Sequence, residues 1–195
     1  MILPSAVCFR VTRFCNARCG FCLAPPDGEH PAAELLLRRV DWLLGHGVRT
    51  VHFCGGEPTI HPALPSLLER VRDGGGAAKL TTNGIAFSPA LIPAVVATGT
   101  RVKVSLHGDR AHHDEIVGRR AFEPATANLR ALLAAAASAV LSDPALAQAK
   151  EQFFPVLVYR TGPYAPNGVP FANGAPNLTV DIPVLTQLAI EKKVP

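Results

Sequence analysis

The chain has 195 residues, of which 48% are hydrophobic and 17% are charged, and its formal net charge is +4. This composition is typical of a globular protein, and the sequence holds no apolar run near the roughly 20 residues that a membrane-spanning helix needs. Residues 1–130 carry 15 Lys and Arg against 11 Asp and Glu, without basic runs or interleaved aromatic residues. So mild an excess is poor support for nucleic-acid binding. We therefore expect neither nucleic acid nor a membrane as a partner.

Five cysteines are present, and three of them fall within eight residues. An odd, clustered set differs from the evenly paired cysteines of small secreted domains and favours metal binding in a reducing compartment. We therefore expect a cytoplasmic protein. The two remaining cysteines, Cys8 and Cys54, are expected to be small buried core residues.

Strands and helices are expected to alternate along the first 130 residues. The expected strands cover residues 5–13, 50–54, 77–82 and 101–106, and the expected helices cover residues 31–46, 63–73, 89–97 and a segment from Phe122 onward. This order predicts an α/β fold of parallel βαβ units with right-handed crossovers. The distinctive residues follow the carboxyl ends of the strands, where a β/α enzyme keeps its active site.

The composition changes near residue 130. Arg130 is followed by an alanine-rich apolar segment over 131–141 and by small residues over 145–149, which together resemble a secretory signal peptide inside the chain. Alternatively, the segment continues the helix that begins at Phe122, because alanine is the best helix former, and we favour this interpretation. Residues 152–174 and 182–195 resemble a periplasmic substrate-binding protein of branched-chain amino acid ABC transporters.

We divide the chain accordingly into three parts. Residues 1–130 form the expected βαβ core, residues 131–150 an alanine-rich helix or signal-peptide-like segment, and residues 151–195 a substrate-binding-protein-like fragment. Eight prolines in residues 131–195 argue against regular structure there. An irregular, proline-rich C-terminal tail is therefore expected, with residues 151–195 poorly structured.

Cys15, Cys19 and Cys22 form a C-x3-C-x2-C motif directly after the first expected strand. Such a compact loop can place three thiolates on three corners of a 4Fe-4S cluster and leave the fourth iron open. The alternative is a structural zinc site, which needs a fourth ligand that His30, Cys8 or Cys54 would supply. The spacing favours iron and sulfur over zinc.

Three more short segments follow the later strands: Gly55-Gly56-Glu57-Pro58, Thr81-Thr82-Asn83-Gly84 and Val104-Ser105-Leu106-His107-Gly108. In the first, the glycines allow the backbone to approach a ligand, and the carboxylate matches an ammonium group. Alternatively, a Gly-Gly turn before a proline in the first turn of a helix is a common connection between a strand and a helix, with no role in ligand binding.

The four segments, in this order and on these elements, resemble the radical S-adenosylmethionine (SAM) superfamily. The resemblance covers residues 9–122. Residues 11–15, residues 114–118 and Phe122 are similar to its molybdenum cofactor cyclase branch. The resemblance implies an enzyme in which Cys15, Cys19 and Cys22 hold a 4Fe-4S cluster, whose open iron binds SAM. One electron from the cluster would cleave SAM to methionine and a 5'-deoxyadenosyl radical, which abstracts hydrogen from a substrate.

The resemblance also implies a set of cofactor-binding residues. They are Phe21 beside the adenine, Gly55, Gly56 and Glu57 at the SAM amino group, Thr82 or Asn83 in the pocket wall, and Ser105 at SAM. The implied partners are a small-molecule or peptide substrate and an electron donor such as flavodoxin or ferredoxin.

Cores of this family usually have six β/α units, and the fifth and sixth are missing after Arg130. The expected architecture is therefore an incomplete (β/α) partial TIM barrel that lacks part of the SAM pocket, which puts its catalytic competence in doubt. Two alternatives remain open: a periplasmic solute-binding fragment of an ABC transporter, and a zinc-binding module without catalysis.

Overall fold

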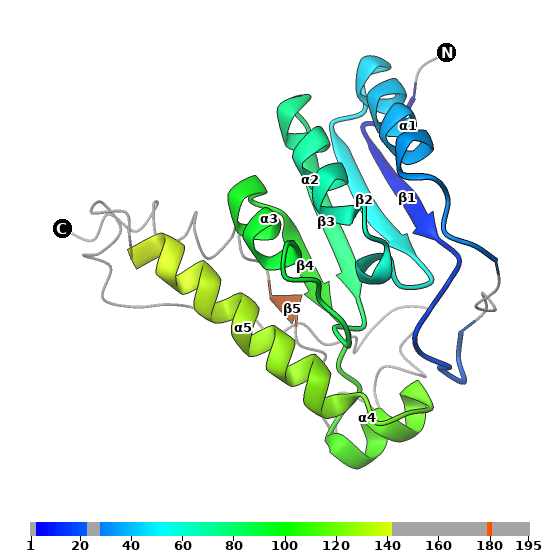
Figure 1. Ribbon diagram of the computed structural model, residues 1–195, viewed down its shortest axis with the longest axis vertical. Helices are drawn as coiled ribbons and strands as arrows, with labels where there is room; N and C mark the ends of the chain where they lie inside the picture. Colours follow the sequence, from blue (N-terminus) through cyan, green and yellow to red (C-terminus); the bar gives the residue numbers. More distant parts are fainter. Residues whose placement is uncertain (1–2, 23–27, 142–178, 181–195) are drawn as a thin grey trace.

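Four parallel strands form the centre of the molecule (Figure 1). The computed structural model describes residues 3–22, 28–141 and 179–180. The strands β1 (Ala6–Thr12), β2 (Thr50–Gly55), β3 (Ala77–Thr82) and β4 (Arg101–Val104) lie side by side in chain order, each parallel to its neighbour. The predicted α/β class and its parallel strands are confirmed.

A fifth strand, β5 (Thr179–Val180), pairs antiparallel with β4. It was not predicted, because two residues in a proline-rich segment carry no periodic signal. The rest of the predicted tail, including residues 142–150 and nearly all of the substrate-binding-protein-like fragment, lies outside the described residues.

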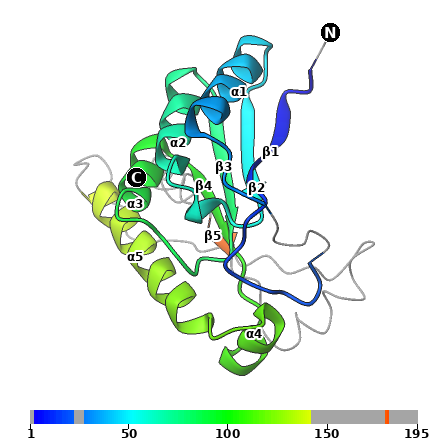
Figure 2. The same ribbon diagram turned by 45° about the vertical axis from the view of Figure 1, so that its right-hand side comes forward.

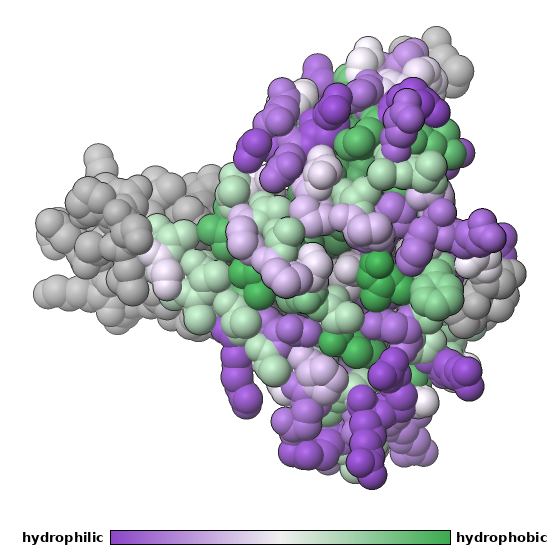
Figure 3. All heavy atoms as spheres, in the orientation of Figure 1, coloured by the Kyte–Doolittle hydropathy of each residue, from purple (hydrophilic) through white to green (hydrophobic). Residues whose placement is uncertain are grey.

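Four helices cover one face of the sheet as a single layer (Figures 1 and 2). They are α1 (Ala33–Gly45), α2 (Leu64–Asp73), α3 (Leu91–Thr98) and α5 (Phe122–Leu141), and each contacts the next in that order. Helix α5 runs unbroken through the alanine-rich segment to Leu141, as the helix interpretation predicted. In Figure 3 the surface over α5 is mostly pale green, whereas hydrophilic residues gather at both the upper and the lower end of the molecule.

Two short helices follow the carboxyl ends of strands. The 3-10 helix η1 (Pro58–Ile60) comes directly after β2, and α4 (Arg110–Val117) follows β4 and lies below the strand ends in Figure 1. Helix α4 begins at an Asp109 side chain that accepts the N–H of His112 at 3.0 Å, which satisfies one unpaired donor of its first turn. None of the helices in the described part of the chain is long and apolar enough to cross a membrane.

The main core lies between the sheet and the helix layer. On each strand every second residue faces the helices, so Val51, Phe53, Leu80 and Val104 are at most 1% exposed. They pack against buried leucines and valines of the helices, including Leu67 of α2. Each such side chain contributes about 1.5–3 kcal/mol to the free energy of folding.

Cys8 and Cys54 are not core residues, which corrects the sequence prediction. Cys8 is exposed and Cys54 half-buried, and the two sulfurs form a disulfide between β1 and β2. The reason is the alternation of the strands: Phe9 and Phe53 occupy the helix side, so their neighbours Cys8 and Cys54 point to the other face.

Candidate cofactor site

The cysteine motif lies in the loop that follows β1, and the end of α4 holds this loop in place. The backbone N–H of Arg18 donates to the carbonyl of Val117 at 3.0 Å. The N–H of Cys22 donates to the carbonyl of Cys19 at 3.0 Å, which closes a turn between the last two cysteines. Backbone contacts therefore fix the path of the loop.

The residues after α4 add a second set of contacts to the same loop. Arg119 Nη1 donates to the carbonyl of Asn16 at 2.6 Å. Gly118 has φ of 72°, and a Cβ there would lie 2.8 Å from the carbonyl oxygen of Arg18. Sequence reasoning missed these roles, and the signal for Gly118 was the similarity of residues 114–118 to one branch of the family.

Two of the three thiols are half-buried, and the third is exposed. Cys15 and Cys19 pack against the small apolar cluster that contains Ala17 and Val117, whereas Cys22 faces solvent. Burial raises the pKa of both half-buried thiols, and the other thiols and Glu57 raise it further. Such thiols stay protonated unless a cation compensates their charge, which suits ligands of an iron cluster.

The glycine pair after β2 packs against the chain that leaves β1. A Cβ on Gly55 would lie 2.3 Å from the carbonyl oxygen of Thr12, and one on Gly56 would lie 2.2 Å from that of Phe14. The N–H groups of Gly56 and Glu57 donate to these same carbonyls, both at 2.8 Å. The two glycines therefore allow the chain after β2 to approach the start of the cysteine loop closely, and this contact positions the motif.

Glu57 joins the end of β2 to the end of β3. Its side chain is buried, and Oε1 accepts from the hydroxyls of Thr59 at 2.6 Å and Thr82 at 2.7 Å. Oε2 accepts from the N–H of Asn83 at 2.7 Å. Burial raises the pKa of this carboxyl, and these hydrogen bonds oppose the rise. Oε2 has one partner among the described residues, so it is the carboxylate atom with capacity for a further donor.

Asn83 connects this network to the first cysteine. Its Nδ2 donates to Asn16 Oδ1 at 2.8 Å and contacts Cys15 Sγ at 4.0 Å. Thr82, by contrast, is 2% exposed, and its hydroxyl donates to Glu57 and accepts from the N–H of Gly84. Of the two candidates for the pocket wall, Asn83 thus lies beside the cysteine loop and Thr82 lies inside the Glu57 network.

Phe21 lies apart from the Glu57 network, whereas Ser105 is joined to it by a backbone hydrogen bond. Phe21 is 60% exposed, and its ring meets that of His107 edge-on at 5.3 Å. Burial, with a smaller contribution from His113, lowers the pKa of His107 to about 4, so this ring is neutral at pH 7. Ser105 is half-buried, and its N–H donates to the carbonyl of Thr82 at 2.9 Å.

The thiols do not converge as ligands of a single ion would. Within the described ranges, no three side chains of His, Cys, Asp and Glu gather at one point that could hold a metal ion. Cys8 and Cys54, two candidates for a fourth zinc ligand, are bonded to each other. The thiolates of a 4Fe-4S cluster bind separate irons and need no common point, so the donor set fits a cluster better than zinc.

The family model of the Radical SAM superfamily matches residues 9–141 of the chain. The chain belongs to the radical SAM superfamily. Members of this family are enzymes that bind a 4Fe-4S cluster and SAM. The match includes the cysteine loop, the segments that follow β2, β3 and β4, and helix α5.

Curated relatives share this part of the chain. The GTP 3',8-cyclase of Chlorobaculum tepidum is 35% identical over 130 residues, which are 64% of this chain and 39% of that protein. The PqqA peptide cyclase of Rhodopseudomonas palustris is 31% identical over 121 residues, 60% of this chain and 32% of that protein. The chain thus spans about a third to two fifths of the length of these relatives.

Solved structures show the same fold. SuiB of Streptococcus suis bound to its precursor peptide SuiA matches with a TM-score of 0.62 and 22% identity, covering 69% of this chain and 31% of SuiB. The structure of SuiB bound to S-adenosylmethionine matches with a TM-score of 0.60 and 20% identity over the same shares. The predicted partial barrel is confirmed at the level of the fold.

Proposed function

We propose that this chain holds a 4Fe-4S cluster through Cys15, Cys19 and Cys22 and cleaves SAM reductively. The observation that carries the proposal is the continuous hydrogen-bonded link from Glu57 through Asn83 and Asn16 to the cysteine loop. Three segments far apart in the sequence are joined there at the carboxyl edge of one parallel sheet, the edge at which β/α enzymes bind their ligands.

Each group of residues at this edge of the sheet would have its own role in binding the cluster or SAM. The cysteine thiolates would hold three irons, and Cys22, the exposed member, lies on the side that an electron donor can approach. Glu57 Oε2 would accept the SAM ammonium, and the Gly55-Gly56 pair sets the distance between Glu57 and the cysteine loop. Phe21 and Ser105 would contact the adenine side of SAM. When bound, the cluster would supply the electron for the reductive cleavage of SAM and so for radical chemistry on the substrate.

The proposal also includes the substrate, the electron donor and the cellular compartment. Two relatives are named for a nucleotide and a peptide substrate, so the substrate is a small molecule or a peptide. A small redox protein such as flavodoxin or ferredoxin would supply the electron. A reducing cytoplasm suits a cluster held by free thiols.

The test is anaerobic reconstitution of the full chain with iron and sulfide, followed by electron paramagnetic resonance of the reduced protein with and without SAM. We expect a reduced-cluster signal that shifts when SAM is added. The Cys19→Ala variant should lose the signal, because it removes one of three iron ligands. The matched control, Cys54→Ala, removes a cysteine outside the loop and should keep both the signal and the shift.

Three results would contradict the proposal. They are bound zinc in place of iron, absence of a cluster signal from the wild-type chain, and a Cys19→Ala variant with the wild-type signal. The third would show that the cluster lies elsewhere.

A further inference from the structure

A covalent bond links the first two strands on the sheet face opposite the helix layer. Cys8 of β1 is in register with His52 of β2, and Cys54 of β2 is in register with Arg10 of β1, so the disulfide runs diagonally between the strands. The two Cα atoms are 6.5 Å apart, a separation within the range that disulfides span. Strand pairing therefore brings the two cysteines into bonding position.

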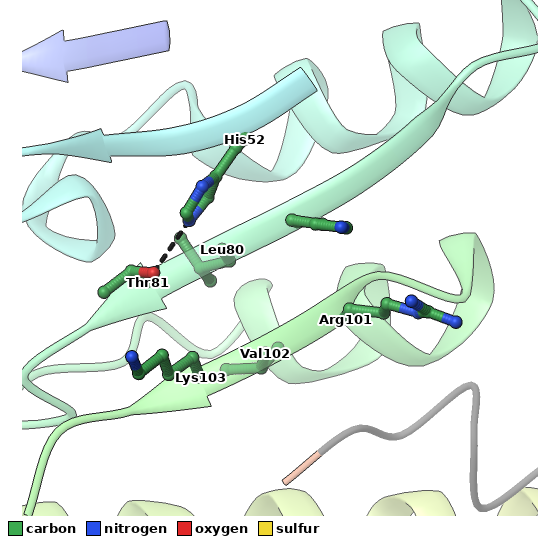
Figure 4. A pocket seen from close by; sticks show the side chains of 7 residues that line it. His52, Leu80, Thr81, Arg101, Val102 and Lys103 are labelled. Carbon is green, nitrogen blue, oxygen red and sulfur yellow. Dashed lines mark hydrogen bonds between the residues drawn. The ribbon is translucent and has the colours of Figure 1, made fainter. Parts of the chain in front are cut away.

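Cys8 is the more accessible of the two cysteines, because it is exposed whereas Cys54 is half-buried. Figure 4 shows His52, the register partner of Cys8, on the side of the strands turned away from the helices, where it lines a hollow of about 160 Å³. A hydrogen bond of 2.7 Å to Thr81 Oγ1 turns the His52 ring towards β3 and away from β1. A thiolate from solvent can therefore reach and attack the Cys8 sulfur.

Cys54 is the better leaving group in such an attack. Its register partner Arg10 lies on the same face, because paired residues of parallel strands point the same way. A guanidinium nearby stabilises a thiolate, and a stabilised thiolate leaves faster in thiol–disulfide exchange. Attack at Cys8 would therefore release Cys54 as a thiolate beside Arg10.

The disulfide and the cysteine loop favour opposite redox conditions. Cys15, Cys19 and Cys22 are free, and they bind iron only as thiolates, which a reducing compartment preserves. Disulfides that form in such a compartment are usually transient, catalytic or redox-sensing. A reversible disulfide suits the protein that holds the cluster, and a permanent one does not.

The disulfide lies close to the start of the cysteine loop. Cys54 directly precedes the Gly55-Gly56 pair, which packs against the chain that leaves β1. Within the described sheet, β1 is the outer strand and pairs with β2 alone. A bond between Cys8 and Cys54 therefore fastens the strand that leads into the cysteine loop, on the side where this strand is paired.

We propose that Cys8 and Cys54 form a reversible dithiol–disulfide site that accepts two electrons from a dithiol reductant. The first thiolate of the reductant bonds to Cys8 Sγ and expels Cys54 as a thiolate, which takes up a proton. The second thiol of the reductant then attacks its own sulfur in this mixed disulfide, so the reductant leaves as a disulfide and Cys8 as a thiol. Oxidation by glutathione disulfide reverses the exchange and yields two molecules of glutathione.

The closed form would hold β1, and with it the start of the cysteine loop, against β2 under oxidising conditions. This proposal rests on the proposed function, because the need for a reducing environment follows from the cluster. The exchange itself involves neither iron nor SAM.

The test follows the bond in the full chain before iron is added. Native protein is incubated with an excess of dithiothreitol or of glutathione disulfide, its free thiols are blocked, and an unreduced digest is analysed by mass spectrometry. We expect the peptides of Cys8 and Cys54 to be linked after oxidation and separate after reduction, without denaturant. Cys22→Ala removes an exposed thiol outside the pair and should keep the linked peptides, whereas Cys54→Ala should lose them.

Hydrogen exchange of the same samples measures how firmly β1 is held. Its amides should exchange roughly tenfold more slowly in oxidised than in reduced wild type, because the bond joins residues 46 positions apart and opposes opening of the strand. Cys54→Ala should exchange equally under both conditions. Cys8→Ser serves as a second variant without the bond, so the comparison does not depend on the folding of Cys54→Ala.

Several results would overturn the proposal. One is the absence of linked peptides in oxidised wild type, and another is oxidation that joins Cys8 or Cys54 to a cysteine of the loop instead. A bond that dithiothreitol opens only in urea would be a permanent structural link. Equal exchange of β1 in both forms would show that the bond does not fasten the strand. Failure of cluster assembly would leave all these measurements unaffected, so the two proposals fail separately.

Discussion

The two faces of the parallel sheet are built from the same four strands but have opposite properties. The face against the helices holds Phe53 and Leu80, which are at most 1% exposed. The opposite face holds Lys79, which is exposed, and Lys103, which is half-buried. Neighbouring residues in one strand thus point either to the core or to the opposite face. The comparison shows that a single step along the chain separates a core position from one on the opposite face.

The largest effect should come from the apolar face. Phe53→Ala removes a fully buried ring that packs edge-on against Phe9 at 5.7 Å. We expect a loss of about 3–5 kcal/mol in the free energy of unfolding, measured by urea denaturation. Lys79→Ala on the opposite face is the matched control and should change it by less than about 0.5 kcal/mol. Equal losses in both variants would remove the distinction between the faces.

The next largest loss of stability should come from the carboxyl edge of the sheet, where Gly56 packs against the start of the cysteine loop. Gly56→Ala would place a Cβ 2.2 Å from the carbonyl oxygen of Phe14, so the start of the cysteine loop must move. We expect a loss of about 1–3 kcal/mol and a lower iron content after reconstitution. Gly45→Ala is the control, because nothing lies within 4 Å of its Cβ position. Wild-type iron content in Gly56→Ala would show that the loop tolerates the displacement.

A smaller effect depends on pH. Burial lowers the pKa of His107 to about 4, below its unfolded value of about 6.5. The unfolded chain therefore binds the proton first as the pH falls, so this stabilisation is complete above pH 6.5 and is lost down to pH 4. Because His107 is only partly buried, we expect about 1–2 kcal/mol.

The measurement for His107 is the free energy of unfolding of wild type and His107→Gln between pH 7 and pH 4. The variant should lose less stability than wild type over this interval, because glutamine does not titrate. Parallel curves would mean that the ring is as accessible to protons in the folded protein as in the unfolded chain.

The smallest effect should have the opposite sign. Lys79→Gln removes a positive charge that is in register with Arg101 on β4 and with His52 on β2. We expect the free energy of unfolding to rise by about 0.2–1 kcal/mol at low salt, and the gain to shrink as salt is added. A loss of stability at low salt would show that Lys79 is compensated in the folded chain.

The sequence by itself determined the four parallel strands, four of the helices and the cysteine motif. Hydrophobic periodicity is local, so residues 77–82 were identified as a strand without knowledge of their neighbours. The spacing of Cys15, Cys19 and Cys22 is local as well, and it indicated iron and sulfur before any fold was known. The short helix α4 was not predicted as an element, because eight residues give a weak periodic signal.

Only the tertiary structure decided which of these residues meet. The link from Glu57 to Asn83 spans 26 residues and that from Asn83 to Asn16 spans 67, and both depend on strand order and register. The pairing of strands also placed Lys79 beside Arg101 and brought Cys8 within bonding distance of Cys54. Local patterns specify which face a residue occupies within its own strand, but contacts between strands are set by pairing and packing across the whole sheet.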